Sequence, residues 1–268
     1  MTAILRIAVN TFRESVRDKV LYNLVFFAIL LMAASYLIGQ LTAGQDVKII
    51  KDLGLAAMSV FGLFIAVFIG IGLVSKEVER RSIYSLLAKP VTRPQIVLGK
   101  YLGLTFTLAV NMTIMTVAFY AVLAYMNWST PSNIRRAWEA PALDPMMLTA
   151  VGLIFVQLLV ITAIATFFST FSSPILSAAL TFGLFVAGQF STDLRNFQDV
   201  VQSPAASRIA ATVYWVLPNL SQFDVKAQVV HAQPVAMGYV AMTTLYAALY
   251  VAMLLAISIT IFSRRDFK

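Results

Sequence analysis

The sequence predicts an all-α integral membrane protein. Hydrophobic residues make up 60% of its 268 residues, charged residues make up 12%, and the mean hydropathy is +0.83. Soluble domains carry about 25% charged residues, so this composition lies far outside their range. Several apolar runs of about twenty residues follow one another, and each is long enough to cross a bilayer as a helix. The net charge of +8 does not indicate a nucleic-acid-binding domain, because the sequence has no basic patch that is interleaved with aromatic residues.

Residues 2–19 are predicted to form a helix that lies in the plane of the lipid headgroups. Leu5, Ala8, Val9, Phe12 and Val16 recur at helical spacing, and Arg6, Asn10, Arg13 and Arg17 follow the opposite face. Basic residues on one side and bulky apolar residues on the other are typical of interfacial helices. The alternative is a disordered basic tail, which the unbroken apolar stripe disfavours.

Six apolar segments are predicted to span the membrane: residues 20–41, 53–74, 96–126, 146–168, 175–190 and 237–262. The third would measure about 46 Å as a helix, so it must tilt or protrude from the bilayer. The fifth has the weakest pattern, because it is short, begins after Pro174 and ends at the polar residues 191–193. We expect a single membrane domain over residues 1–268, with no catalytic residues and no cofactor or metal site. The single histidine, His231, has no partners at metal-ligand spacing.

The distribution of charge predicts the orientation. With both termini and the loop after the second span on the inside, 13 of the 20 Lys and Arg residues lie there, and so does the whole net charge of +8. The outside segments are then neutral, as the positive-inside rule requires. Both termini are therefore expected on the cytoplasmic side.

The loop at residues 75–93 is a long and highly charged insert between two strongly apolar segments. Val78, Ile83, Leu86 and Leu87 share one helical face, and most of the charged side chains lie opposite. Pro90 ends this pattern, and the segment from Thr92 to Gln95 has the spacing of a capping box that starts a new helix. One interpretation is a solvated basic loop. The other is a helix that docks onto a cytoplasmic partner.

Two outer segments are substantial, at residues 127–145 and 191–236. Within the second, the apolar stretch 205–217 is too short to span, so it either lies on the outer surface or re-enters the membrane.

Neutral polar residues occur within the spans, and five of them are candidates for a weakly polar translocation path: Asn111, Thr113, Thr116, Gln157 and Gln189. The favoured interpretation of such residues is hydrogen bonding between helices. The predicted spans contain no charged residue except Lys100, near an inner end. An ion-coupled carrier is therefore disfavoured, and the energy for transport must come from another subunit.

The chain resembles the ABC type-two permeases, especially the subfamily that includes the nitrous-oxide-reductase maturation permease. The resemblance rests on the amphipathic start, the run KEVERRSIYSLLAKPVTRPQIVLGKYLG, the outer LPNLSQFDVK and the ending FSRRDFK. Its most specific part is a motif in which Glu77, Arg80, Ser82, Leu86, Leu87, Pro90, Val91 and Arg93 occupy the defining places. The resemblance implies a type V ABC exporter fold, with an elbow helix at 2–19, six spans, and outer helices between spans five and six. It also implies a coupling helix between spans two and three.

We therefore expect the transmembrane subunit of an ATP-driven ABC transporter of the exporter type, in a bacterial inner membrane. Its partners would be two separate ATPase subunits, which bind ATP and Mg, a second permease copy or a related permease, and membrane lipid. The expected ATPase-coupling residues are Lys76, Glu77, Glu79, Arg80, Arg81, Ser82, Leu86, Leu87, Lys89 and Arg93. The alternative is a non-transporting subunit that passes ATPase motion to a periplasmic partner through residues 191–236. The larger final outer loop departs from the polysaccharide exporters, so no sugar substrate is inferred.

Overall fold

The computed structural model describes residues 3–41, 46–79, 92–136, 138, 140–191 and 217–264. In these ranges every regular element is a helix, which confirms the predicted all-α class. The long helices are α1 (Ala3–Val16), α2 (Lys19–Gln40), α3 (Asp46–Glu79), α5 (Arg93–Ser129), α7 (Met147–Ser169), α8 (Pro174–Gln189) and α12 (Met237–Arg264). Three short helices, α6 (Ser132–Arg135), η1 (Ser221–Phe223) and α11 (Lys226–Val230), complete the described part.

Five of these helices are long and apolar enough to cross a membrane: α2, α3, α5, α7 and α12. The fifth predicted span corresponds to α8, which has only 16 residues, as the sequence pattern indicated. Pro174 occupies the first turn of α8, where its missing N–H costs nothing. Among the spans, α3 differs most from its predicted bounds. Helix α3 begins at Asp46 and runs to Glu79, so it takes in seven residues before the predicted span and five after it.

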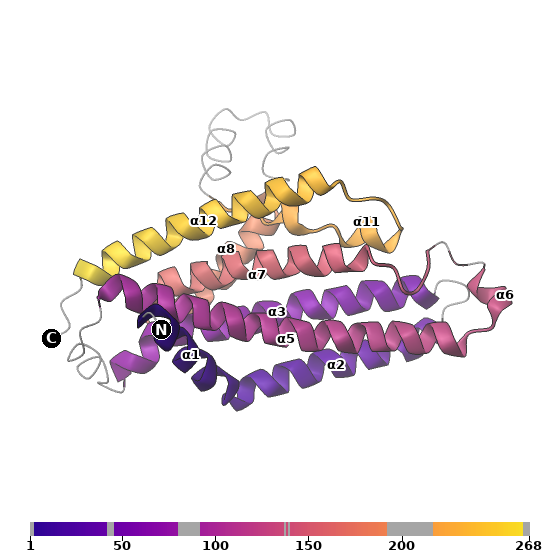
Figure 1. The fold of residues 1–268 in the computed structure, drawn as a ribbon, viewed down its shortest axis with the longest axis horizontal. Coiled ribbons are helices and arrows are strands. Elements are labelled where there is room, and N and C mark those ends of the chain that lie inside the picture. Colours follow the sequence, from indigo (N-terminus) through magenta and orange to yellow (C-terminus); the bar gives the residue numbers. More distant parts are fainter. Residues whose placement is uncertain are drawn as a thin grey trace.

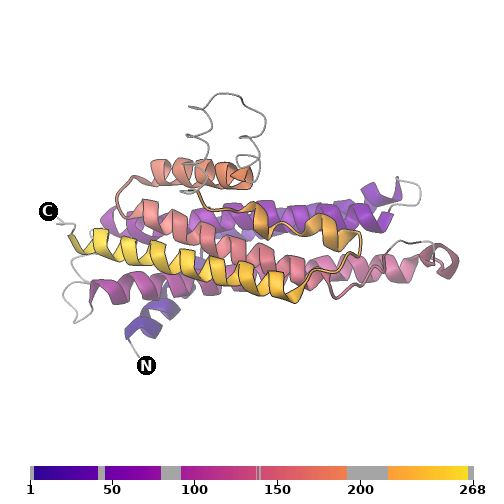
Figure 2. The same ribbon diagram turned by 90° about the horizontal axis from the view of Figure 1, so that it is seen from above.

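Helices α3 and α7 form the centre of the bundle. In each of them 67% of the apolar span is buried, against 28% in α2 and α12 and 33% in α5. Glycines let α3 and α7 approach closely, because a Cβ atom on Gly70 would lie 2.5 Å from the Cβ of Ala165. Small residues at such contacts are typical of membrane helix pairs. Around this pair, α2 and α12 lie on opposite sides (Figure 1), as do α1 and α8 (Figure 2).

The ends of the bundle differ. Helix α3 ends, and α5 and α8 begin, at the end where α12 also finishes and where α1 begins (Figure 1). We call this the loop end, because it is where residues 80–91 connect α3 to α5, and we call the other the far end.

The predicted amphipathic segment is helical and forms α1. It turns into α2 at Asp18, whose Oδ1 accepts a hydrogen bond from the Val20 N–H (3.1 Å).

Helix α1 packs against the first turns of α5 through two glycines. A Cβ atom on Gly103 would lie 2.5 Å from the Ala8 carbonyl oxygen, and one on Gly99 would lie 2.9 Å from the Ile4 carbonyl oxygen. The Phe12 ring meets Phe106 edge to face, with 5.6 Å between centroids. The face of α1 that packs on α5 therefore includes residues beyond the predicted stripe, whereas Leu5 and Val9 of that stripe are exposed. The packed face differs from the predicted stripe because the two glycines of α5 leave room for the backbone of α1.

A buried lysine joins three elements at the far end. Lys51 of α3 is fully buried, and its Nζ donates to the Pro141 carbonyl oxygen at 2.8 Å. Asp144, from the same loop, interacts electrostatically with Lys51 and is itself buried. The Tyr120 hydroxyl of α5 donates to the Asp144 carbonyl oxygen at 3.1 Å. The loop before α7 is thus held against both α3 and α5.

We expect Gly103→Ala to destabilise the protein, because the new methyl group would collide with the α1 backbone. Overpacking of this kind costs about 1–3 kcal/mol. Gly152→Ala on α7 is the matched control, since nothing lies within 4 Å of its Cβ position, and it should be neutral or slightly stabilising. Thermal unfolding of both purified variants in nanodiscs measures the difference. Equal melting temperatures for the two would contradict the close approach of α1 and α5.

Asp144→Asn and Lys51→Met should each destabilise the protein. Each single replacement leaves a buried charge without its partner, which costs about 3–5 kcal/mol, whereas the double replacement leaves no uncompensated charge. The amide oxygen that replaces the carboxylate can still accept the hydrogen bond that the Met146 N–H donates to this side chain. The double variant should be more stable than Asp144→Asn alone, and Lys48→Met serves as the control on the same helix. Thermal unfolding in nanodiscs measures all four variants, and strictly additive changes in melting temperature would show that the two charges are not coupled.

Candidate functional site

The predicted coupling loop begins as a continuation of α3. The backbone at Lys76, Glu77 and Glu79 belongs to the last turns of this helix, so the charged insert does not start with a separate helix. The side chains of these residues lie outside the described part of the structure. Six further predicted coupling residues, Arg80, Arg81, Ser82, Leu86, Leu87 and Lys89, also lie outside the described residues. Their role stays a prediction.

The structure confirms the predicted start of the next helix. Thr92 has extended backbone angles and precedes Arg93, and the Thr92 N–H donates to Gln95 Oε1 at 3.1 Å. Pro94 lies in the first turn, where a proline is tolerated. This cap fixes where the loop ends and where the 37-residue helix α5 begins.

Arg93 is the predicted coupling residue whose side chain the structure describes. Its Nη1 donates to the carbonyl oxygens of Phe262 (3.0 Å) and Ser263 (2.5 Å), both in the last turn of α12. The last carbonyl groups of a helix lack partners within the helix, and a guanidinium group can satisfy them. The sequence pattern assigned Arg93 to the coupling loop but contained no sign of its partner, which lies 169 residues away.

The five residues of the predicted translocation path lie on three helices. Asn111, Thr113 and Thr116 of α5 each donate to the carbonyl oxygen four residues earlier, at 2.9, 2.8 and 2.7 Å. These bonds lie within one helix and not between helices, because a short polar side chain in a bilayer is satisfied most easily by its own backbone. Gln189 is half-buried near the end of α8. Among the described residues, no hydrogen bond joins any two of the five.

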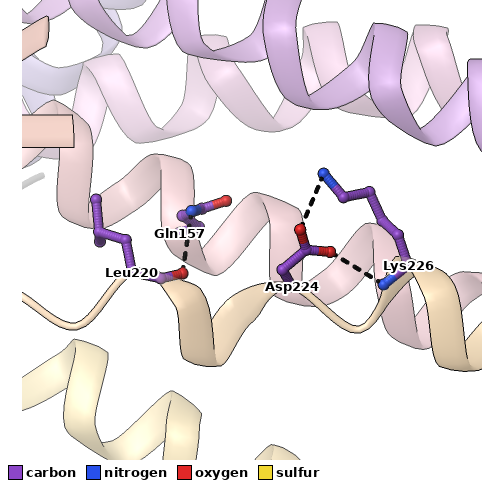
Figure 3. A network of polar contacts seen from close by, with 4 residues as sticks. All are labelled: Gln157, Leu220, Asp224 and Lys226. Atoms are coloured by element: carbon purple, nitrogen blue, oxygen red, sulfur yellow. Dashed lines mark hydrogen bonds and ion pairs between the residues drawn. The ribbon is translucent and has the colours of Figure 1, made fainter. Parts of the chain in front are cut away.

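Gln157 makes a contact between segments that are distant in sequence. It is buried on α7, and its Nε2 donates to the Leu220 carbonyl oxygen at 3.3 Å (Figure 3). Gln157 lies about 15 Å along α7 from the far end of that helix, so Leu220 also lies well inside the bundle. Figure 3 also shows Asp224, which forms an ion pair with Lys226 (3.4 Å) on the same segment.

The non-helical residues 217–220 are held on three sides. The Leu220 N–H donates to the Gly188 carbonyl oxygen of α8 (3.1 Å), and the Asn219 N–H donates to the Tyr246 hydroxyl of α12 (2.9 Å). Asn219 Oδ1 accepts from Ser191 and from Ser221, each at 2.7 Å. Irregular backbone inside a membrane protein persists only where such partners are supplied. The sequence indicated a turn at Pro218 but not these partners.

The buried Lys51 was also missed, because the predicted span began two residues after it. A usable signal was present, since Lys51 shares one helical face with Val47, Leu55 and Met58, which are all buried. As for metal binding, no three His, Cys, Asp or Glu residues in the described ranges lie close enough to hold an ion.

Comparisons with known proteins agree with this architecture. A search of curated proteins found no match. The family model described as "ABC-2 family transporter protein" matches residues 5–267, which is almost the whole chain. Because the match covers almost the whole chain, and because several helices are capable of spanning a membrane, the chain belongs to the ABC-2 family of transporter permeases.

Proposed function

We propose that this permease is the transmembrane subunit of an ATP-driven exporter, moved by a separate ATPase that docks on the loop between α3 and α5. The family match over residues 5–267 is the observation that carries the proposal. The arrangement of the helices supports it. Two long helices, α3 and α5, flank residues 80–91, so a force on these residues would reach the far end along both helices.

The permease would act mechanically. Two ATPase subunits would bind ATP and Mg, and their closure would displace the loop at residues 75–93. Helix α3 packs against α2, α5, α7 and α8, so its displacement would change the packing on every side of the bundle centre. Helices α2, α3 and α8 would then shift to open or close an outward path. The loop residues supply contacts with the ATPase, and the span residues supply the lining.

The proposed location is the bacterial inner membrane, with the loop end in the cytoplasm. The net charge of +8 resides in the segments at this end, as the positive-inside rule requires for cytoplasmic segments. Large apolar side chains are exposed along α2 and α12, including Phe26 (60%), Leu37 (65%), Met242 (73%) and Leu249 (65%). These faces suit lipid or a second permease subunit.

A second function is favoured by the way residues 217–230 are anchored. Leu220, Phe223, Val229 and Val230 are buried, and the segment bonds to α7, α8 and α12. Motion of these helices would therefore reach residues 217–230. A subunit of this kind would pass ATPase motion to a periplasmic partner without transporting a substrate. Transport into liposomes by the purified complex separates the two functions.

Single cysteines at positions 82 and 203 should be labelled from opposite sides of the membrane. The chain has no cysteine of its own, so Ser82→Cys and Ser203→Cys each provide one unique thiol. An impermeant maleimide added to spheroplasts should label only the cysteine at position 203, and labelling at position 82 should require permeabilisation. If both thiols react from the periplasm, the proposed orientation is wrong.

Arg80→Glu and Arg81→Glu together should abolish copurification of the ATPase while leaving membrane insertion intact. Charge pairs at an interface contribute about 1.5–7 kcal/mol, and 1.4 kcal/mol already changes affinity tenfold. The double variant should therefore weaken the complex by at least about tenfold.

Arg135→Glu with Arg136→Glu is the matched control, because it reverses two adjacent exposed arginines at the far end. This control should retain the ATPase. Labelling at position 203 shows whether each variant keeps its orientation. If the Arg80 and Arg81 variant binds the ATPase normally, the loop only connects two helices, and the docking proposal is refuted.

A further inference from the structure

The two hydrogen bonds from Arg93 connect elements that are far apart in sequence. Arg93 is the first residue of α5, and it follows directly on the loop between α3 and α5. Its guanidinium group binds two carbonyl oxygens in the last turn of α12. The Phe262 side chain in that turn is buried, so the end of α12 is also held by packing.

The position of Arg93 is unfavourable for its own helix. The N-terminus of a helix carries a partial positive charge, which disfavours a cation, and the first turn of α5 contains no acidic residue. The C-terminus of α12 carries a partial negative charge, which favours one. The end of α12 is therefore a stabilising partner of the guanidinium group, and hydrogen bonds from a charged group are the stronger kind.

We propose that Arg93 is a positioning residue that ties the start of α5 to the end of α12, so that displacement of the loop moves the last span together with α5. The proposal rests on the proposed function of the loop. It assigns Arg93 a different task from Arg80 and Arg81, because the Arg93 guanidinium group binds α12 within this chain. We call this contact the Arg93 clamp.

The first experiment measures the clamp in the full-length permease. Leu102 of α5 and Ile257 of α12 are exposed (45% and 41%), so spin labels on cysteines at these positions should not disturb the core. The labelled chain is reconstituted in nanodiscs with an excess of unlabelled chain, which dilutes distances between copies. Arg93→Met removes the guanidinium group, Arg93→Lys keeps the charge, and Arg264→Met is the control, because Arg264 is an exposed cation in the same turn of α12.

Without nucleotide, Arg93→Met should broaden or lengthen the distance distribution between the two labels. Arg93→Lys should give an intermediate distribution, and Arg264→Met should match the unsubstituted protein. If Arg93→Met gives the same distribution as the unsubstituted protein, there is no clamp. This measurement requires no ATPase, so it is independent of the proposed function.

The second experiment measures transmission in the complex with the ATPase. Arg93→Met should retain copurifying ATPase within about twofold, but its ATP-driven activity should fall at least about tenfold. The free energy of one hydrogen bond from a charged group is large enough for a change of this size. Loss of the ATPase itself would make Arg93 a docking residue and overturn the proposal. Unchanged ATP-driven activity would overturn it too. If the unsubstituted permease binds no ATPase, the proposed function fails and the transmission role fails with it, while the first experiment still decides the clamp.

Discussion

The need to satisfy every backbone polar group inside a bilayer accounts for most of this structure. It explains why the long elements are helices and why the polar residues on α5 bond back to their own helix. It also explains the hydrogen bonds around residues 217–220. Helix α8 ends after 16 residues, and residues 217–220, where the described chain resumes, are held against α7 without helical structure. Gln157, Gly188 and Tyr246 supply the missing partners, one from each neighbouring helix.

Local chemistry was predictable from the sequence, and contacts between distant segments were not. Pro174 and the pair Thr92 and Gln95 indicated where helices begin, because capping depends on neighbouring residues. The predicted second span ended at residue 74, where hydrophobicity falls, whereas the helical backbone of α3 continues to Glu79. Lys51 was assigned to a loop because its charge outweighed the periodicity of its neighbours. Its burial depends on Pro141 and Asp144, which no local pattern connects to it.

The two ends of the bundle are held together by different kinds of interaction. At the far end, a buried charge and its partners fasten the loop before α7 onto α3 and α5. At the loop end, the contacts include close backbone packing at Gly99 and Gly103 and the carbonyl groups bound by Arg93. Separating the Lys51 ammonium group from its partners while it stays buried would leave a charge uncompensated, whereas the partly exposed Arg93 contact at a helix terminus can be exchanged for water.

Helix α5 has a special place in this arrangement. The beginning of the chain packs on its first turns through α1, and the end of the chain is bound to its first residue through α12. Helix α3, which carries the other end of the same loop, packs on α2 and α7. A partner that pushed on residues 80–91 would therefore act on α3 and α5 together, because these two helices contact each other and both pack on α2 and α7.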